Sequence, residues 1–324
     1  MSEAIIIKEY GDSDVLVLDT VDVPHPDANE LRIRQTAIGV NYHDVYVRSG
    51  LYKTLAIPGI PGCEATGVVE AIGSEVKGFN TGDRVAYVTG TYGAYATNRV
   101  LPADLAIRLP DDISDEIAAS NLLRAMTVEM LTAQVLRIEP DMTILVHAAA
   151  GGVGRMLCQV ASHIGATVIG TVGTAQKAEI ARENGCEFPV LYRDTDFVKA
   201  VAQLTEGRGA DAVFDSVGAD TFAGSLNALA MCGHLVNFGQ SSGPVDPLLM
   251  SALAVKSLTV SRPILFHYLV KPDQYQAMAQ RVFEKFRAGI LRAADPLPVA
   301  LKDARQAHDK LEGMTGGGAL ILIP

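Results

Sequence analysis

The stretch AAAGGVG, residues 148–154, decides the fold of this chain of 324 residues. An apolar, strand-like run (TILVH, residues 143–147) precedes it, and Met156, Val160 and Ile164 follow it at helical spacing. A strand, a glycine-rich turn and an amphipathic helix in this order typically bind the pyrophosphate of a dinucleotide. The stretch therefore predicts a Rossmann-type nucleotide-binding unit.

Within this loop each glycine has its own role. Gly151 lets the backbone approach the phosphates, and Gly154 lets the helix pack closely on the strand. The helix N-terminus offers free N–H groups and a partial positive charge to an anion. Ala149 replaces the first glycine of the common GxGxxG pattern, so a tight turn in another α/β protein is an alternative explanation. The predicted pyrophosphate-binding residues are Gly151, Gly152, Val153 and Gly154.

Composition restricts the class of protein. A net charge of −10 provides no positive field for nucleic acid or anionic lipid, so a nucleic-acid partner is disfavoured. The four cysteines are far apart and form no CxxC pair, which is typical of free thiols in a reducing compartment. Neither a signal peptide nor a long apolar segment is recognisable, so we expect a cytoplasmic protein that does not span a membrane.

The chain divides into a β-rich part and an alternating part. Up to about residue 120, short apolar runs alternate with glycine- and proline-rich turns, which indicates a small, mostly-β domain. After Ser114, strands alternate with helices, which predicts βαβ units and a doubly wound parallel sheet. The last strand, residues 319–323, has no place in that sheet, and we expect it to return to the β-rich part. The predicted domains are residues 1–122 with 264–324, and residues 123–263.

The end of the second strand of the Rossmann unit predicts which dinucleotide binds. NAD-preferring domains usually carry an acidic residue there, which accepts hydrogen bonds from the adenine ribose. This chain has Gly173 and Thr174 instead, and Lys177 follows in the first turn of the next helix. A neutral loop beside a lysine accepts a 2′-phosphate that a carboxylate would repel. We therefore predict NADPH as cofactor, with a solvated helix lysine as the alternative reading of Lys177.

The positions expected to hold a catalytic zinc have the wrong residue types. Asn41 stands where the alcohol dehydrogenase pattern needs cysteine, and Cys63 stands where it needs histidine. The four-cysteine structural zinc lobe is absent, and no Tyr-x-x-x-Lys of the short-chain reductases occurs. We therefore predict no metal, although His43 and Cys63 are conceivable soft ligands.

A site without zinc restricts the substrate. Reducing a simple ketone gives an alkoxide, whose conjugate acid is about as weak as water, with a pKa of about 15.7. Such an anion needs a strong electrophile beside it. Reducing a quinone gives a phenolate-type anion with a conjugate-acid pKa of about 10, which hydroxyls, amides and water can stabilise. A metal-free site therefore favours quinones or conjugated carbonyl compounds.

The chain resembles the NADPH:quinone oxidoreductases, relatives of zeta-crystallin in the zinc-free medium-chain dehydrogenase/reductase superfamily. The resemblance covers nearly the whole length. It rests on NYHDVYVRSGLY (41–52), GCEATGVVEAIG (62–73), GDRVAY (82–87), HAAAGGVG (147–154), GTVGTAQKAE (170–179), FDSVG (214–218), FGQSSGP (238–244) and KDARQAHDKLE (302–312).

The resemblance implies a Rossmann domain with a doubly wound parallel sheet plus a discontinuous, GroES-like, mostly-β domain. It implies metal-free reduction of a small quinone by NADPH, through hydride transfer or one-electron steps. It also implies a homodimer joined through the edge of the Rossmann sheet. The residues matching the surroundings of the nicotinamide, with catalytic roles, are Asn41, Tyr46, Tyr52 and Thr127. Those matching the pocket of the 2′-phosphate are Gly173, Thr174, Lys177 and Tyr192. Those matching the ribose and nicotinamide contacts are Ser216, Val217, Phe238, Gly239 and Ser241.

Two departures from the family pattern and two other functions stay open. Relatives often have Lys-Gly where this chain has Arg124-Ala125, and a basic residue where it has Gly313-Met314. These changes affect the expected pocket size and cofactor affinity. The other functions are an NADPH-dependent enone or enoyl-thioester reductase, and a non-catalytic NADPH-binding protein of the crystallin or RNA-binding kind.

Overall fold

The computed structural model describes residues 2–313 and 318–324, and its contacts divide the chain into two compact units. Unit 1 contains Met1–Leu123, Leu269–Ala279 and Ala293–Pro324, and unit 2 contains Arg124–Tyr268 and Gln280–Arg292. The boundaries predicted from the sequence differ at residue 123, which belongs to unit 1, and at residues 264–268 and 280–292, which belong to unit 2. The second half of helix α9 (Pro272–Arg287) is bound in unit 2 through Arg281 and Lys285, which both contact the buried carboxylate of Glu129.

Unit 2 is built on a six-stranded parallel sheet in the order β10-β9-β8-β11-β12-β13. The strands are β8 (Thr143–Val146), β9 (Thr167–Val172), β10 (Phe188–Leu191), β11 (Ala210–Asp215), β12 (Leu229–Asn237) and β13 (Thr259–Ser261). Every pair in this sheet is parallel. The chain starts at β8, runs outward to β10, and then returns to β11 on the other side of β8. This reversal of strand order is where Rossmann folds bind their ligands, beyond the carboxyl ends of the strands.

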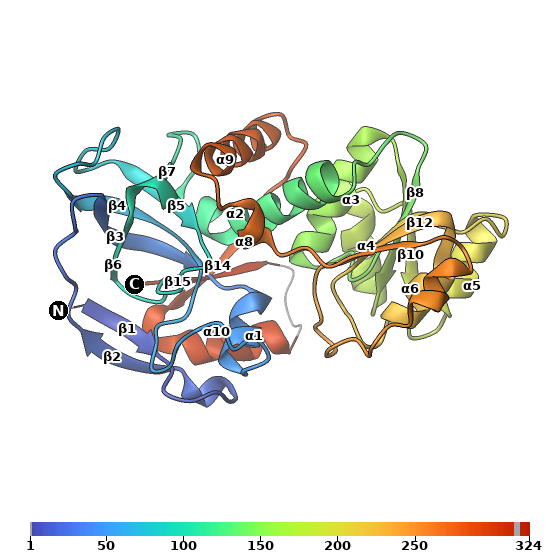
Figure 1. Cartoon of the computed structure of the whole chain (residues 1–324), viewed down its shortest axis with the longest axis horizontal. Helices are drawn as coiled ribbons and strands as arrows, with labels where there is room; N and C mark the ends of the chain where they lie inside the picture. Colours follow the sequence, from blue (N-terminus) through green and yellow to red (C-terminus); the bar gives the residue numbers. More distant parts are fainter. Residues whose placement is uncertain (1, 314–317) are drawn as a thin grey trace. The chain divides into compact units, whose positions relative to one another are not determined.

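Helices cover both faces of this sheet. Figure 1 shows α3 and α4 together on one face and α5 and α6 together on the other. The helices of this unit are α3 (Gly152–Ile164), α4 (Ala175–Glu183), α5 (Phe197–Leu204), α6 (Phe222–Ala228), α7 (Met250–Ala254) and α8 (Leu265–Tyr268). Buried strand residues such as Leu145, Ile169 and Val213 form the core with Val201 and Phe222 from the helices. The predicted doubly wound parallel sheet is confirmed.

Unit 1 contains a mostly antiparallel sheet in the order β14-β15-β3-β4-β5-β7, with β6 also paired to β3. A hairpin of β1 (Ser2–Ile6) and β2 (Val17–Val21) forms a separate two-stranded sheet. The seven strands of the large sheet are β3 (Glu30–Gly39), β4 (Glu64–Ile72), β5 (Arg84–Val88), β6 (Asn98–Pro102), β7 (Ile107–Arg108), β14 (Pro296–Ala300) and β15 (Ala319–Ile323). Unit 1 is therefore the predicted discontinuous, mostly-β part.

The last strand returns to this sheet, as expected from the sequence. β15 pairs antiparallel with β3, through Ile321 with Gly39 and Leu322 with Ile38. Its other neighbour, β14, was not predicted, because Pro296 and Pro298 interrupt the strand pattern. A proline lacks the N–H of the hydrogen-bond ladder, so it is tolerated on an edge strand, which is the position of β14.

Helices α1 and α10, together with the first parts of α2 and α9, also belong to unit 1. The short helix α1 (Tyr42–Arg48) follows β3 directly and lies beside α10 (Ala304–Glu312), as Figure 1 shows. Helix α2 (Asp115–Met130) starts in unit 1, and after it the chain continues as a π-helical turn, Leu131–Val135. In the part of the chain that the structure describes, no helix combines the length and apolar character needed to span a membrane.

Helix α9 is anchored to the sheet of unit 1 through one tyrosine. Tyr275 is 1% exposed, and its hydroxyl accepts the N–H of Val88 at 2.9 Å and donates to the carbonyl of Leu105 at 3.1 Å. One side chain therefore satisfies two backbone groups that belong to different segments. Burial raises the pKa of Tyr275, so the hydroxyl stays protonated and able to donate.

We predict that Tyr275→Phe destabilises the protein by about 2 to 4 kcal/mol, because it leaves a buried N–H and a buried carbonyl without their partner. Chemical denaturation measures the change. Tyr192→Phe is the control, because Tyr192 is 51% exposed and its loss of a hydroxyl should change stability by less than about 0.5 kcal/mol. Equal stability of both variants would contradict the anchoring role of Tyr275.

Candidate functional site

The glycine loop connects β8 to α3, and its backbone is packed so closely that there is no room for a side chain at Gly154. Gly151 is the N-cap of α3, and a Cβ at Gly154 would lie 2.2 Å from the carbonyl oxygen of Ala148. Only glycine therefore allows the helix to start this close to the strand. Ala148 itself has a φ of 51°, a left-handed conformation that a non-glycine residue rarely adopts.

The glycine missing from position 149 has its counterpart on the neighbouring strand. Ala149 is fully buried, and a Cβ on Gly170 of β9 would lie 2.5 Å from the Cβ of Ala149. The chain therefore accommodates a methyl group in the loop by having no side chain on the strand beside it. Sequence reasoning did not find this pair, because the two residues are 21 positions apart.

The buried, neutral His147 is linked to the glycine loop through Thr171. His147 donates or accepts at both ring nitrogens, with Thr171 Oγ1 3.0 Å from Nδ1 and Ser225 Oγ 2.9 Å from Nε2. Burial lowers the pKa of His147 to about 4, so the ring is uncharged at neutral pH. Thr171 also accepts the N–H of Ala148 at 3.3 Å, which joins the loop to the end of β9.

The predicted 2′-phosphate residues lie together at the carboxyl ends of β9 and β10. Thr174 is the N-cap of α4 and accepts the N–H of Lys177 at 3.2 Å. A Cβ on Gly173 would lie 2.9 Å from the hydroxyl of Tyr192, so glycine leaves room for that ring beside the loop. Lys177 is in the first turn of α4, half-buried, and no carboxylate follows β9 directly.

The loops after β11 and β12 are tied to each other. The N–H of Phe238 donates to Asp215 O at 2.8 Å, and the N–H of Ser241 donates to Ser216 O at 3.2 Å. The carboxylate of Asp215 is fully buried and accepts the N–H of Val217 at 2.8 Å. Sequence reasoning missed Asp215. The five predicted ribose and nicotinamide residues thus lie on two connected loops at one edge of the sheet.

Arg124 brings a positive charge to the glycine loop. A Cβ on Gly152 would lie 3.1 Å from the guanidinium carbon of Arg124, which is 8% exposed. Gly152 is the first residue of α3, where the helix dipole already favours an anion. The residue that departs from the family pattern therefore lies beside the predicted pyrophosphate site. The other departure, at Met314, lies outside the described residues.

Three of the four predicted catalytic residues lie together in unit 1. Asn41 is the N-cap of α1, Tyr46 is on that helix, and Tyr52 follows it. The rings of Tyr46 and Tyr52 are 4.9 Å apart, and His43 is 5.7 Å from Tyr52 and 5.9 Å from Tyr92. Thr127 lies on α2 in unit 2 and is half-buried.

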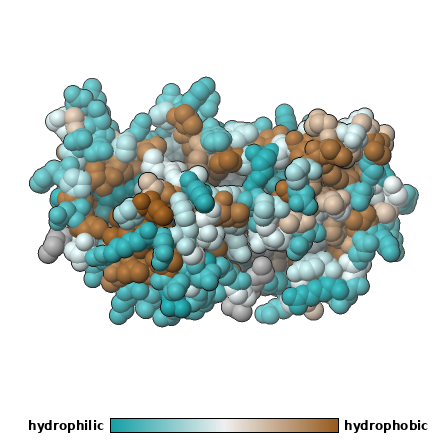
Figure 2. Space-filling model, turned by 60° about the horizontal axis from the view of Figure 1, so that its bottom comes forward, coloured by the Kyte–Doolittle hydropathy of each residue, from teal (hydrophilic) through white to brown (hydrophobic). Residues whose placement is uncertain are grey.

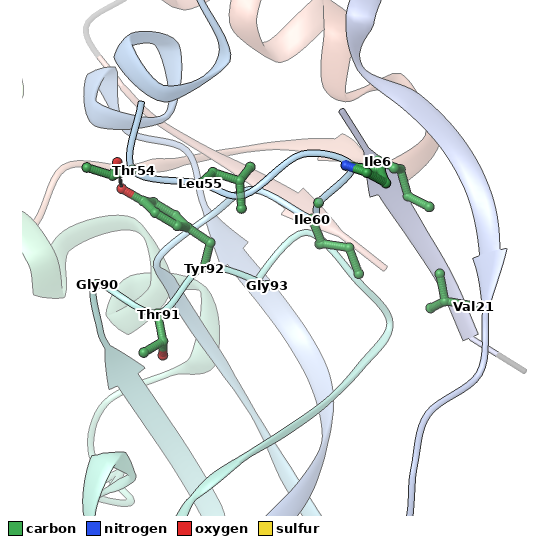
Figure 3. A pocket seen from close by; sticks show the side chains of 11 residues that line it. Ile6, Val21, Thr54, Leu55, Ile60, Gly90, Thr91, Tyr92 and Gly93 are labelled. Atoms are coloured by element: carbon green, nitrogen blue, oxygen red, sulfur yellow. Dashed lines mark hydrogen bonds between the residues drawn. The ribbon is translucent and has the colours of Figure 1, made fainter. Parts of the chain in front are cut away.

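Tyr92 also lines a pocket in unit 1. Its hydroxyl is 2.6 Å from Thr54 Oγ1 and 3.0 Å from Nε2 of His43. Figure 3 shows the ring of Tyr92 extending toward Thr54, with apolar side chains on the opposite side of the pocket. The lining residues are Ile6, Val21, Thr54, Leu55, Pro58, Gly59, Ile60, Gly90, Thr91, Tyr92 and Gly93.

Known proteins match the chain over its whole length. Residues 27–111 match the model of the alcohol dehydrogenase GroES-like domain, and residues 152–284 match that of the zinc-binding dehydrogenase. A quinone oxidoreductase of Pseudomonas aeruginosa is 40% identical over 325 residues, with both chains covered completely. The chain belongs to the quinone oxidoreductase family of the medium-chain dehydrogenase/reductases.

Two further relatives describe the range of this family. The crystal structure of Escherichia coli quinone oxidoreductase complexed with NADPH superimposes with a TM-score of 0.95 at 39% identity, covering 100% of both chains. A 2-haloacrylate reductase from Burkholderia is 37% identical and covers 100% of this chain and 99% of its own. The expected GroES-like and Rossmann architecture is thereby confirmed, and this member of the quinone oxidoreductase family is an oxidoreductase.

The possible metal ligands of this quinone oxidoreductase family member are poorly suited to zinc. Burial lowers the pKa of His43 to about 4 and raises that of Cys63 well above its usual range, so Cys63 remains a thiol. Within residues 2–313 and 318–324, no cluster of three or more histidine, cysteine or carboxylate side chains could hold a metal. The prediction of no metal remains a prediction.

A buried polar network lies behind Asn41. Arg48 donates to Nδ1 of His308 at 3.3 Å, and because an arginine only donates, Nε2 of His308 carries the hydrogen and faces Tyr95 at 3.0 Å. Tyr95 in turn donates to the carboxyl of Asp44 at 3.2 Å. Asp44 also accepts the N–H of Asn41 at 2.8 Å, as part of the capping box of α1. The network therefore ends on Asn41, the N-cap of α1.

Asp44 gives this network a pH dependence. Burial raises the pKa of Asp44 from 3.8 to about 7, although hydrogen bonds from Asn41, Tyr95 and Cys63 act in the opposite direction. The folded-state pKa is therefore above the unfolded one. The stability due to Asp44 is fully present below the unfolded pKa and is lost as the pH rises through the folded pKa.

We predict that the stability of the wild type falls relative to Asp44→Asn between about pH 5 and 7, with a slope of at most about 1.4 kcal/mol per pH unit. An asparagine keeps the acceptor for the N–H of Asn41 but does not ionise. Urea denaturation at several pH values measures both proteins side by side. A constant difference across this range would show that Asp44 is ionised in the folded state.

Proposed function

We propose that this chain reduces small quinones with NADPH, without a metal. The proposal is carried by the full-length similarity to an Escherichia coli quinone oxidoreductase whose structure contains NADPH. Two features of the chain support it independently. The Rossmann loop is intact around Gly151 and Gly154, and Lys177 follows a strand that ends without a carboxylate.

The residues present fit a dinucleotide phosphate. Gly154 permits the close turn, the N-terminus of α3 offers its free N–H groups, and Arg124 adds a cation beside Gly152. Lys177 and Tyr192 would hold the 2′-phosphate next to Gly173, where a Cβ would lie 2.9 Å from the tyrosine hydroxyl and the ring would have to shift. When bound, NADPH supplies the hydride and the remaining work is positioning and charge stabilisation.

The residues of unit 1 would stabilise the reduced oxygen. Asn41 can donate an amide N–H, and Tyr46 and Tyr52 can donate hydroxyl groups from rings that pack against each other. Donors of this strength suffice for a phenolate-type product but not for an alkoxide. We therefore assign Asn41, Tyr46, Tyr52 and Thr127 as residues that contact substrate and nicotinamide, with no obligatory proton donor among them.

A conjugated carbonyl compound is the second candidate substrate. The 2-haloacrylate reductase is nearly as similar to this chain as the quinone oxidoreductases are, and its acceptor is named as a substituted acrylate. Reduction of such an acceptor also delocalises negative charge, so the same neutral donors could serve it. Discrimination between the two acceptors would depend on the aromatic walls around Tyr52 and Tyr92.

We also propose a homodimer that joins two copies through β13. This strand is at the edge of the parallel sheet and is only three residues long. Leu249, the N-cap of helix α7, and Met250, the first residue of that helix, are 75% and 77% exposed. On the face drawn in Figure 2, apolar patches lie between hydrophilic surfaces. A dimer that covers β13, Leu249 and Met250 would pair the free edge of the strand and remove apolar area from water.

The cofactor assignment predicts a selective effect of one lysine. Lys177→Ala should weaken NADPH binding about 10- to 100-fold and change NADH binding less than about twofold, because only NADPH carries the 2′-phosphate. Titration of nicotinamide fluorescence measures both dissociation constants. Lys199→Ala, on the exposed face of α5, is the matched control and should change neither. Equal losses for both cofactors would contradict the role of Lys177.

The substrate assignment predicts an order of acceptors. We expect kcat/KM for NADPH oxidation to be highest with a small benzoquinone or naphthoquinone, lower with a cyclic enone or a haloacrylate, and lowest with an enoyl thioester. Added EDTA should leave the rate unchanged. Rapid turnover of an enone while quinones remain inert would favour the second candidate, and loss of activity with EDTA would contradict a metal-free site.

A further inference from the structure

Glu64 is a buried carboxylate that accepts hydrogen bonds from Asn41 and Leu123 and is not among the residues proposed to contact substrate or cofactor. It is the first residue of β4 and is 1% exposed. Its Oε2 accepts from Nδ2 of Asn41 at 2.8 Å, and its Oε1 accepts the N–H of Leu123 at 2.5 Å. A carboxylate in its ionised form only accepts, so both contacts fit that form.

This contact determines which way the Asn41 amide points. The NH₂ group of Asn41 faces Glu64 and donates to it, and this is the orientation that an ionised carboxylate, which offers only acceptors, would select. The carbonyl end of the same amide is engaged in the capping box of α1 with Asp44. One amide hydrogen is bound to Glu64, and the second is left to donate elsewhere.

The space for Glu64 depends on a glycine. A Cβ on Gly39 would lie 2.4 Å from Oε2 of Glu64 and 2.3 Å from the carbonyl oxygen of Ala119. The pairing of Ile38 with Ala65 holds the end of β3 beside the start of β4, so Gly39 and Glu64 are forced together. Any side chain at Gly39 would push the carboxylate away from Asn41. The pairing of β3 with β4, the absence of a side chain at Gly39 and the N-cap of α1 thus together fix the position of the Glu64 carboxylate.

We propose that Glu64 is a positioning residue: it holds the Asn41 amide so that one N–H is presented to the substrate oxygen that gains negative charge. The proposal rests on the proposed function of Asn41. Glu64 itself touches neither cofactor nor substrate in this assignment. The carboxylate is retained in the core because a fixed donor needs no reorganisation when charge develops.

Glu64→Gln tests the orientation with almost no change of shape. A glutamine can offer its oxygen to Leu123 or to Asn41 but presents an NH₂ group to the other, so two donors oppose each other. We expect kcat with quinone to fall about 10- to 100-fold, while the dissociation constant of NADPH changes less than about twofold. Glu129→Gln, which also replaces a buried carboxylate, is the control and should lower stability while largely retaining kcat.

A double-mutant cycle separates positioning from general damage. If Glu64 acts through Asn41, then Glu64→Gln added to Asn41→Ala lowers kcat by less than about twofold beyond Asn41→Ala alone. A full additional loss would overturn the proposal. The free energies of unfolding of the same four proteins must also show coupling between the two positions, and additive values would overturn it as well.

The swap Asn41→Asp with Glu64→Gln distinguishes this proposal from the proposed function. Here the glutamine donates to the new aspartate and accepts from Leu123, so the hydrogen bonds re-form with reversed polarity. We expect the thermal midpoint to recover toward that of the wild type while kcat stays low, because no amide N–H remains at position 41. Recovery of both would refute the donor role of Asn41, whereas recovery of neither would refute the link between Glu64 and Asn41.

Discussion

The close approach of helix α3 to the end of β8 is the constraint on which the dinucleotide-binding unit depends. A Cβ at Gly154 would overlap the carbonyl of Ala148, so the start of the helix is fixed by the absence of one side chain. The same approach aims the helix N-terminus at the carboxyl edge of the sheet. Lys177 in the first turn of α4 and the loops that begin at Ser216 and Phe238 lie at that edge, because parallel strands all end there.

In unit 1 the corresponding constraint is electrostatic. Helix α1 is short, and both partners of its capping box are buried. Asp44 receives donors from the Arg48–His308–Tyr95 network, and Glu64 receives donors from Asn41 and Leu123. Such groups are expensive to bury unless each has a partner. The arrangement therefore tolerates few alternative positions for Asn41, which is the property that a hydrogen-bond donor in an active site requires.

The sequence allowed the parts with local signals to be predicted. The strand–loop–helix pattern around Gly151 can be recognised from residues that are neighbours in the sequence, and so can the absence of a carboxylate at the end of β9. The return of residues 319–323 to unit 1 was predictable because this strand has no place in the parallel sheet of unit 2. Contacts between distant segments left no such signal: Ala149 faces Gly170, Arg124 reaches Gly152, and Asp215 supports two loops. The strand β14 was missed because its prolines suit only an edge.

The pairing of β15 with β3 also affects the order in which the protein can fold during synthesis. The residues that meet in this pair are separated by almost the whole chain, whereas the parallel strands of unit 2 all lie between Thr143 and Ser261. Unit 2 can therefore assemble its sheet while the chain is still emerging from the ribosome. Unit 1 must wait with an open edge on β3 until β15 has been synthesised and released. Unit 1, whose first segment is synthesised before unit 2, is thus completed after unit 2.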